Sequence, residues 1–158
     1  MKNFPIRFLI AGLLLAFANI VAAQSGPYDE NADARQQIKQ ALTQTASDHK
    51  TVIIVFGANW CPDCRMLEYA MNKGASASLI EKDFEVVKIS VGRFDKNVDV
   101  AASYGVPLKE GIPAVSFVSP DNHVLYVTKE GELANARSMG DDGIYKFFKQ
   151  VLASLPKK

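Results

Sequence analysis

Two cysteines separated by two residues, Cys61 and Cys64, are the side chains of this sequence best suited to chemistry. They are the only cysteines in the 158 residues. Helix positions three apart lie on the same side of a turn, so the two sulfurs could form and break a disulfide with each other. In such a cycle Cys61 attacks a disulfide to give a mixed disulfide, and Cys64 then attacks Cys61 and releases the reduced product.

Two other uses of the cysteines stay open. A structural disulfide between residues three apart would close a very small loop, and small loops remove little chain entropy from the unfolded state. A zinc site normally has four ligands, and the further nitrogen or sulfur candidates, His49 and His123, lie far apart in the sequence. We therefore favour the redox pair, and we expect no metal and no cofactor besides the Cys61–Cys64 disulfide itself.

A buried strand followed by a helix is predicted to position Cys61. Residues 51–56 form an unbroken apolar, β-branched run that is typical of a strand covered on both faces. Pro62 suits the first turn of a helix, and helical spacing of apolar residues continues until Gly74. Cys61 then lies at a helix N-terminus, whose partial positive charge stabilises a thiolate. We predict that Cys61 is the nucleophile and that Cys64, one turn deeper, is the resolving thiol.

Asp63 lies between the two cysteines and should influence their reactivity. At ~7 Å its charge would oppose a Cys61 thiolate by about 0.6 to 2.4 kcal/mol for dielectric constants from about 80 to 20. The helix terminus supplies about 0.3 to 1 kcal/mol of stabilisation, and at most ~2. Because these effects are comparable, we predict that Cys61 is only modestly acidic and that the pair is not a strong oxidant.

The remaining pattern alternates helices and strands. Helices are predicted over residues 31–48, 95–104 and 141–155, and strands over residues 84–91, 114–118 and 123–128. The last two strands should form a hairpin, and Asp141 or Asp142 should cap the final helix. We interpret residues 24–30 as a flexible lead-in and residues 131–140 as a surface connection. Together these elements predict one α/β domain over residues 24–158, with a central mixed sheet of about four to five strands flanked by helices.

An export signal is predicted over residues 1–23. Lys2 and Arg7 are basic, residues 8–21 are nearly all apolar, and small residues end the segment. The apolar run is shorter than the roughly 20 residues that cross a bilayer, and Asn19 interrupts it, so a membrane anchor is the weaker alternative. We predict a periplasmic or otherwise exported protein, in a compartment where disulfides persist.

Composition and charge narrow the classes of partner. The chain is 48% hydrophobic and 22% charged, as expected for one globular domain. Its formal net charge is +1, and removal of the predicted signal leaves 16 basic and 17 acidic residues. Since no basic excess favours nucleic acid or an anionic membrane surface, we expect neither as a partner. We expect a monomer.

The motif Trp60-Cys61-Pro62-Asp63-Cys64 after a hydrophobic strand, with Gly111-Ile112-Pro113 before a later strand, resembles the thioredoxin superfamily over roughly residues 31–155. More narrowly, it is similar to exported bacterial thioredoxin-like proteins with a Cys-Pro-Asp-Cys centre. The resemblance implies a thioredoxin-like fold and a thiol–disulfide oxidoreductase that acts as a reductase or isomerase on protein or peptide disulfides. In an oxidising compartment, a membrane electron-donor protein would have to recharge such an enzyme.

The resemblance also assigns residues around the cysteines. In the family, the proline corresponding to Pro113 is cis and faces the cysteine pair, and the backbone beside it, here at Ile112, receives an extended substrate segment. Trp60 would border the same groove, although a tryptophan beside a buried strand equally often packs against the core. Pro62 and Asp63, inside the motif, would tune the redox chemistry.

This sequence departs from the family at two positions. Thioredoxins have a buried acidic residue where this chain has Val55, and a helix-kinking proline where it has Tyr69. Without that carboxylate, proton transfer to and from Cys64 must use water or another group. Lys88 aligns with a family lysine that could help, but a lysine at a strand end more simply extends to solvent, and we favour that interpretation.

A noncatalytic function is the alternative to the enzyme. A thioredoxin-like module could use the groove at Pro113 to hold a partner, or its two thiols to bind copper. Turnover in a disulfide-reduction assay separates these possibilities from an oxidoreductase.

Overall fold

A four-stranded mixed sheet forms the centre of the molecule in the computed structural model, which describes residues 26–156. Its strands, in the spatial order β2-β1-β3-β4, are β1 (Thr51–Gly57), β2 (Phe84–Ser90), β3 (Ala114–Val118) and β4 (Val124–Val127). Strand β1 pairs parallel with β2 and antiparallel with β3, and β3 and β4 form an antiparallel hairpin. The predicted fold class and hairpin are confirmed, whereas the predicted signal over residues 1–23 lies outside the described residues.

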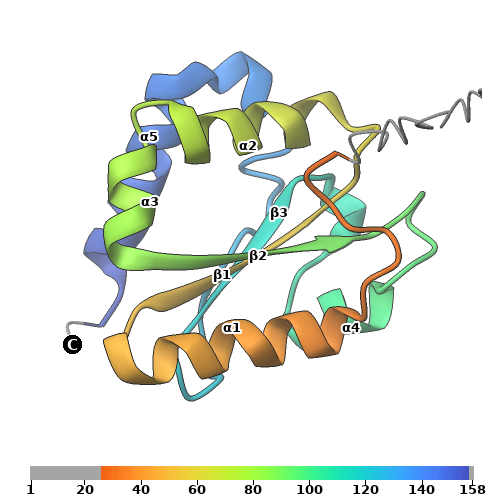
Figure 1. Cartoon of the computed structure of the whole chain (residues 1–158). Coiled ribbons are helices and arrows are strands. Elements are labelled where there is room, and N and C mark those ends of the chain that lie inside the picture. The colour runs from red at the N-terminus through yellow and green to blue at the C-terminus, as the bar shows by residue number, and fades with distance from the viewer. Residues whose placement is uncertain (1–25, 157–158) are drawn as a thin grey trace, which may run out of the picture.

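Helices cover both faces of the sheet (Figure 1). They are α1 (Ala34–Asp48), α2 (Pro62–Lys73), α3 (Ala77–Asp83), α4 (Val98–Ser103) and α5 (Ala136–Ser154), with a short 3₁₀ turn, η1 (Leu108–Glu110). Helix α1 packs on β1 and β2, whereas α2 packs beside α5 on the opposite face. Within residues 26–156, every helix is too short or too polar to cross a membrane.

The central position of β1 explains its composition. All seven residues of the strand are buried, as predicted from its apolar, β-branched run. On one side lies the buried stripe of α1, formed by Ala34, Ile38, Ala41 and Thr45. Helix α1 begins at a capping residue, Asp33, whose carboxylate accepts a hydrogen bond from the Gln36 N–H at 3.0 Å. A rigid, fully covered strand thus delivers the chain to the cysteine motif.

An aromatic cluster fills the core on the face of the sheet that carries α5. Phe117, on β3, has no exposed surface. Its ring makes edge-to-face contacts with Phe84 at 5.6 Å, Tyr126 at 5.7 Å and Phe148 at 6.2 Å between ring centroids. These arrangements suit the charge distribution of aromatic rings and add to the burial energy. The cluster joins three strands to α5.

Folded structure begins earlier than predicted. Residues 24–30 were interpreted as a flexible lead-in, but Tyr28 exposes only 1% of its surface. The side-chain amide of Asn59 holds it, accepting from the Tyr28 N–H at 3.0 Å and donating to the Tyr28 carbonyl at 2.8 Å. The prediction was wrong because the polar residues around Tyr28 are typical of a flexible segment. The residue that fixes Tyr28, Asn59, lies 31 residues away in the sequence.

The segment 131–140 is also more than the predicted surface connection. Leu133 and Ala136 are fully buried, and α5 starts at Ala136, five residues before the predicted helix. A kink at Gly140, with φ of 63°, interrupts the helical period and conceals the first turn in the sequence. The residue before this N-terminus is Asn135, so neither of the predicted caps, Asp141 and Asp142, is in the capping position. Asp141 instead accepts a hydrogen bond from the Ala75 N–H at 2.8 Å.

Candidate active site

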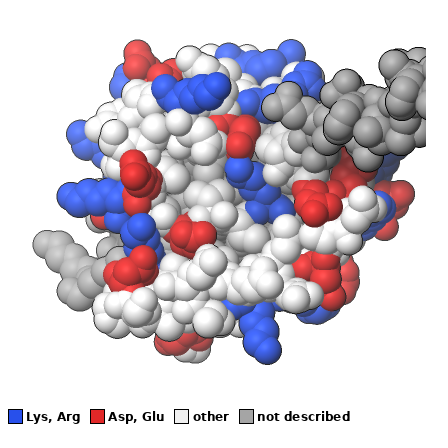
Figure 2. All heavy atoms as spheres, viewed as in Figure 1, with Lys and Arg blue, Asp and Glu red and all other residues white. Residues whose placement is uncertain are grey.

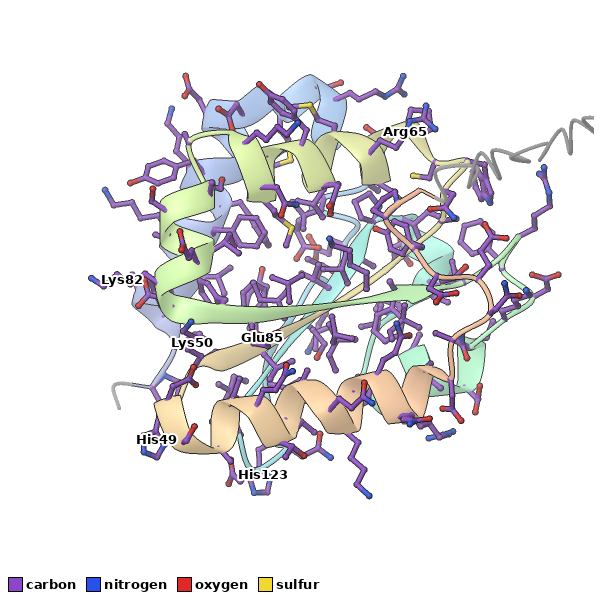
Figure 3. The ribbon with its side chains drawn as sticks, in the orientation of Figure 1. His49, Lys50, Arg65, Lys82, Glu85 and His123 are labelled. Atoms are coloured by element: carbon purple, nitrogen blue, oxygen red, sulfur yellow. The ribbon has the colours of Figure 1, made fainter. Side chains whose placement is uncertain are left out.

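Cys61 occupies the N-cap position of α2. Its backbone is extended, with φ of −79° and ψ of 118°, and Pro62 begins the helix behind it. The Cys64 N–H donates to the Cys61 Sγ at 3.2 Å, so an unsatisfied donor of the first helical turn points at the sulfur. Both thiols are free and largely covered by protein. In Figure 3, Arg65 marks this end of α2.

The pKa values of the two thiols are shifted in opposite directions. The hydrogen bond with Cys64 is the main cause that lowers the pKa of Cys61 to about 7, and the backbone N–H groups of Cys64 and Asp63 add to it, against burial and the Asp63 charge. The same hydrogen bond, followed by burial, raises the pKa of Cys64 far above that of an ordinary thiol. At neutral pH, a large share of Cys61 is therefore thiolate while Cys64 keeps its proton.

The loop before β3 closes over Cys61 from the other side. The Ile112–Pro113 peptide bond is cis, and the Cys61 thiol donates to the Ile112 carbonyl at 3.5 Å. Gly111, with φ of 111°, precedes these residues in a conformation that favours glycine. The structure thus brings Ile112 and Pro113 beside the cysteine pair, although 51 residues separate Cys61 from Ile112.

Trp60 lies on the surface next to the cysteines. Its side chain is 43% exposed, its indole N–H donates to the Gly92 carbonyl at 2.8 Å, and its ring meets the Phe94 ring edge to face at 6.2 Å. The alternative that Trp60 packs in the core is wrong. Phe94, 44% exposed, was not anticipated, because an aromatic residue in a turn has no periodic signal.

A pocket adjoins this aromatic pair. It has a volume of about 410 Å³ and is lined by Phe94, Val98, Leu108, Lys109 and Gly111. Gly111 connects the pocket to the loop at Ile112, and Phe94 connects it to Trp60. A largely apolar recess thus lies next to the aromatic pair and to the start of the loop at Ile112.

Arg137 neutralises Asp63 from the start of α5. The Asp63 carboxylate accepts from the Arg137 backbone N–H at 2.9 Å and from its Nε at 3.3 Å, and the Arg137 Nη2 lies 3.3 Å away. Partial burial alone would raise the pKa of Asp63, but these contacts outweigh it and hold the pKa below its usual value. The repulsion predicted between Asp63 and a Cys61 thiolate is consequently offset by a guanidinium that the sequence did not reveal.

This ion pair leads to a prediction about acidity. Asp63→Asn should move the pKa of Cys61 below 7, since it removes a negative charge that disfavours the thiolate. Arg137→Met should move that pKa above 7, because it leaves the Asp63 charge unbalanced. Ultraviolet absorbance of the thiolate against pH measures both.

The double variant Asp63→Asn/Arg137→Met is the control, and its Cys61 pKa should return toward 7. Shifts of the same sign in the two single variants would contradict the prediction, since they would show that structural disturbance rather than charge controls the thiol.

Lys88 does not extend freely to solvent, so the interpretation favoured from the sequence was wrong. Its Nζ lies 2.6 Å from the Glu68 Oε2, and its side chain is only 22% exposed. Lys88 stands opposite Val55 in the β1–β2 register, and Val55 is buried and apolar. The Glu68 carboxylate is therefore present beside Lys88, but it comes from the second turn of α2 and not from strand β1.

The zinc alternative requires further ligands close to the two cysteines. Residues 26–156 contain no group of three or more His, Cys, Asp or Glu side chains that could hold a metal ion. Figure 3 shows His49 and His123 beside α1, on the other face of the sheet from α2. Figure 2 shows acidic and basic side chains interspersed over the visible face, as expected from the balanced charge.

Comparison with known proteins places this geometry in a family. A family model described as thioredoxin-like matches residues 33–120. The chain belongs to the thioredoxin-like family. A solved structure of a disulphide isomerase from Xylella fastidiosa Temecula1 is 52% identical, with a TM-score of 0.78, over 82% of this chain and 99% of that one. With a free dithiol at a helix N-terminus, the site is that of a thiol–disulfide oxidoreductase.

Two more distant relatives are also similar to this chain. Protein disulfide isomerase-like 1-2 of Oryza sativa is 26% identical over 107 residues, which are 62% of this chain and 20% of that protein. This chain thus spans about a fifth of the length of that relative. Thioredoxin NaTrxh from Nicotiana alata is 22% identical, with a TM-score of 0.50, over 79% of this chain and 89% of that one.

Proposed function

We propose that this protein reduces or isomerises disulfides in proteins through a cycle of Cys61 and Cys64. Cys61 attacks a substrate disulfide as a thiolate and forms a mixed disulfide. Cys64 then attacks Cys61, the Cys61–Cys64 disulfide forms, and the reduced substrate leaves. The observation that carries the proposal is the position of Cys61 at the N-cap of α2, where the Cys64 N–H contacts its sulfur at 3.2 Å.

The acidity of Cys61 favours the reducing direction. Strongly oxidising members of this fold stabilise their reduced form through a very acidic cysteine, with a pKa of about 3.5, whereas the reducing thioredoxin has about 7. The pKa of Cys61 is about 7. The thiolate thus reacts at neutral pH without making the disulfide a strong oxidant.

The surroundings of Cys61 favour an extended polypeptide as substrate. The Ile112 carbonyl already binds the Cys61 thiol at 3.5 Å, so the loop that carries it borders the reacting atom. Trp60 and Phe94 expose their rings, and the pocket of about 410 Å³ beside Phe94 and Gly111 offers space for an apolar side chain of the substrate. The name of the Xylella fastidiosa relative, a disulphide isomerase, supports the same class of substrate.

We further propose that the protein works outside the cytoplasm. The basic and apolar pattern of residues 1–23 supports export. In an oxidising compartment, a reductase or isomerase must receive electrons from a dithiol partner, and a membrane electron-donor protein is the class of partner that could supply them.

Reduction of insulin with a small dithiol as electron source tests the activity. The protein should precipitate the insulin B chain catalytically, and it should also reactivate a scrambled disulfide protein if it is an isomerase. Stoichiometric consumption of the two thiols without turnover would contradict the proposal and favour a noncatalytic or copper-binding module. A midpoint potential near that of the most oxidising members of the fold would reject the reducing direction.

A further inference from the structure

Tyr28 is a buried phenol that reaches the resolving cysteine from outside the sheet. It lies in the segment before α1 and exposes only 1% of its surface. Its hydroxyl contacts Gly57, the last residue of β1, so closely that a Cβ atom at this position would overlap with it. From this position the phenol lies close enough to Cys64 for a hydrogen bond from its hydroxyl to lower the pKa of the Cys64 thiol, against the larger effects of the bond with Cys61 and of burial that raise it. Glycine at position 57 therefore provides the space in which a tyrosine reaches the sulfur.

The structure holds Tyr28 in this place through the active-site loop itself. Asn59, two residues before Cys61, binds both the N–H and the carbonyl of Tyr28. The same amide donates to the Glu30 Oε1 at 2.9 Å, and Lys96 donates to the Glu30 carbonyl at 3.2 Å. The segment is thus attached to the loop that carries the motif, and the phenol and the cysteines keep a fixed geometry.

The chemistry of the cycle gives this contact a use. Cys64 has no exposed surface, and its thiol must lose a proton before it can attack a mixed disulfide. Val55 offers no polar group there, and the Glu68 carboxylate is paired with Lys88. Burial, followed by the charge and hydrogen bond of Cys64 and then by the charges of Cys61 and Glu68, raises the pKa of Tyr28 well above 10. Its hydroxyl therefore keeps its proton and can donate it in a hydrogen bond.

We propose that Tyr28 is a catalytic residue of the second half of the cycle, in which its hydroxyl donates a hydrogen bond that stabilises the Cys64 thiolate. This inference rests on the proposed dithiol function. In the step, Cys64 gives its proton to water and its sulfur attacks the Cys61 sulfur. The Cys61–Cys64 bond forms, the bond from Cys61 to the substrate sulfur breaks, and that sulfur leaves with the electron pair and takes a proton from water. The substrate is reduced by two electrons, and the dithiol is oxidised.

Tyr28→Phe tests the proposal, because it removes the hydroxyl and keeps the ring. One equivalent of the symmetric reagent dithiobis-nitrobenzoate releases a first coloured thiol when Cys61 attacks and a second when Cys64 resolves the mixed disulfide. In rapid mixing, the first phase should be unchanged. The second should slow about tenfold or more at neutral pH, and its pH profile should move to higher pH, since a hydrogen bond to a charged group is lost.

Tyr69→Phe is the matched control, since Tyr69 is an exposed tyrosine on α2, and it should change neither phase. Asn59→Ala, which releases the segment while keeping the phenol, should also slow the second phase. An unchanged second phase in Tyr28→Phe would overturn the inference. So would a slower second phase that keeps the pH profile of the unaltered protein. Failure of the proposed function is distinguishable, because the unaltered protein would then release no second thiol at all.

Discussion

Replacing Cys61 with serine should abolish disulfide exchange, with a loss of turnover on the order of 1,000-fold or more. A serine hydroxyl at the N-cap of α2 can accept the hydrogen bond that the Cys64 N–H donates to the sulfur, so the fold should persist. It cannot become an anion near neutral pH, however, and it cannot form a mixed disulfide. Insulin reduction measures the loss, and thermal unfolding checks that the variant is folded.

Cys64→Ser is the matched control for this result. It retains the nucleophile and lacks the thiol that resolves the intermediate, so it should accumulate mixed disulfides with its substrates instead of turning over. Identification of the trapped proteins by mass spectrometry would name those substrates. If both serine variants reduced insulin at the rate of the unaltered protein, the assignment of the cysteine pair would be wrong.

Phe117→Ala should have the largest effect on stability, because Phe117 is fully buried among three other aromatic rings. Removal of such a side chain loses its burial energy and leaves a cavity, which typically costs about 3 to 5 kcal/mol. Total stabilities are about 5 to 15 kcal/mol, so a large part of the free energy of unfolding should disappear. Urea denaturation of the reduced protein measures this change.

Phe94→Ala provides the comparison for this prediction. Phe94 is 44% exposed, and an exposed substitution of this kind usually changes the free energy of unfolding by about 0.5 kcal/mol or less. A loss for Phe117→Ala no larger than that for Phe94→Ala would contradict the role of the aromatic cluster as the centre of the core.

The elements that could be predicted from the sequence are those that depend on residues close to one another along the chain. An apolar β-branched run, a proline at the first helical position and apolar residues at helical spacing indicated β1, the turn and α2, and all three are present. The placement of Cys61 at a helix N-terminus followed from the same local pattern. The hairpin of β3 and β4 was predicted for a similar reason, because a short polar turn separates two apolar runs.

The sequence did not reveal the groups that control the cysteines from a distance. Arg137 contacts Asp63 across 74 residues, and Tyr28 contacts Asn59 across 31 residues. Neither side chain belongs to a repeating pattern, so only the packing of α5 and of the segment before α1 brings them to the site. Helix α3 was missed as well, since seven residues without an extended apolar period give little helical signal.

These distant contacts alter the charges and hydrogen bonds around both cysteines. From the sequence, Asp63 alone was expected to weaken the Cys61 thiolate, and the missing carboxylate at Val55 left water or another group, with Lys88 as a candidate, to move the proton of Cys64. In the structure, Arg137 balances Asp63, and Tyr28 and the Glu68–Lys88 pair occupy the surroundings of Cys64. The motif provides the two sulfurs and the hydrogen bond that mainly shifts their pKa values, whereas side chains from other elements adjust the charges and hydrogen bonds around them.

The rate of alkylation of each cysteine against pH tests whether Cys61 is the nucleophile of the pair. Iodoacetamide should modify Cys61 with a half-maximal rate near pH 7, because the pKa of this thiol is lowered to about 7. About a tenth of it should be thiolate at pH 6 and about nine tenths at pH 8. Cys64, located by mass spectrometry, should stay unmodified over this range. A Cys61 that is inert across neutral pH, or that titrates like an ordinary thiol, would show that the start of α2 does not activate this sulfur as a nucleophile.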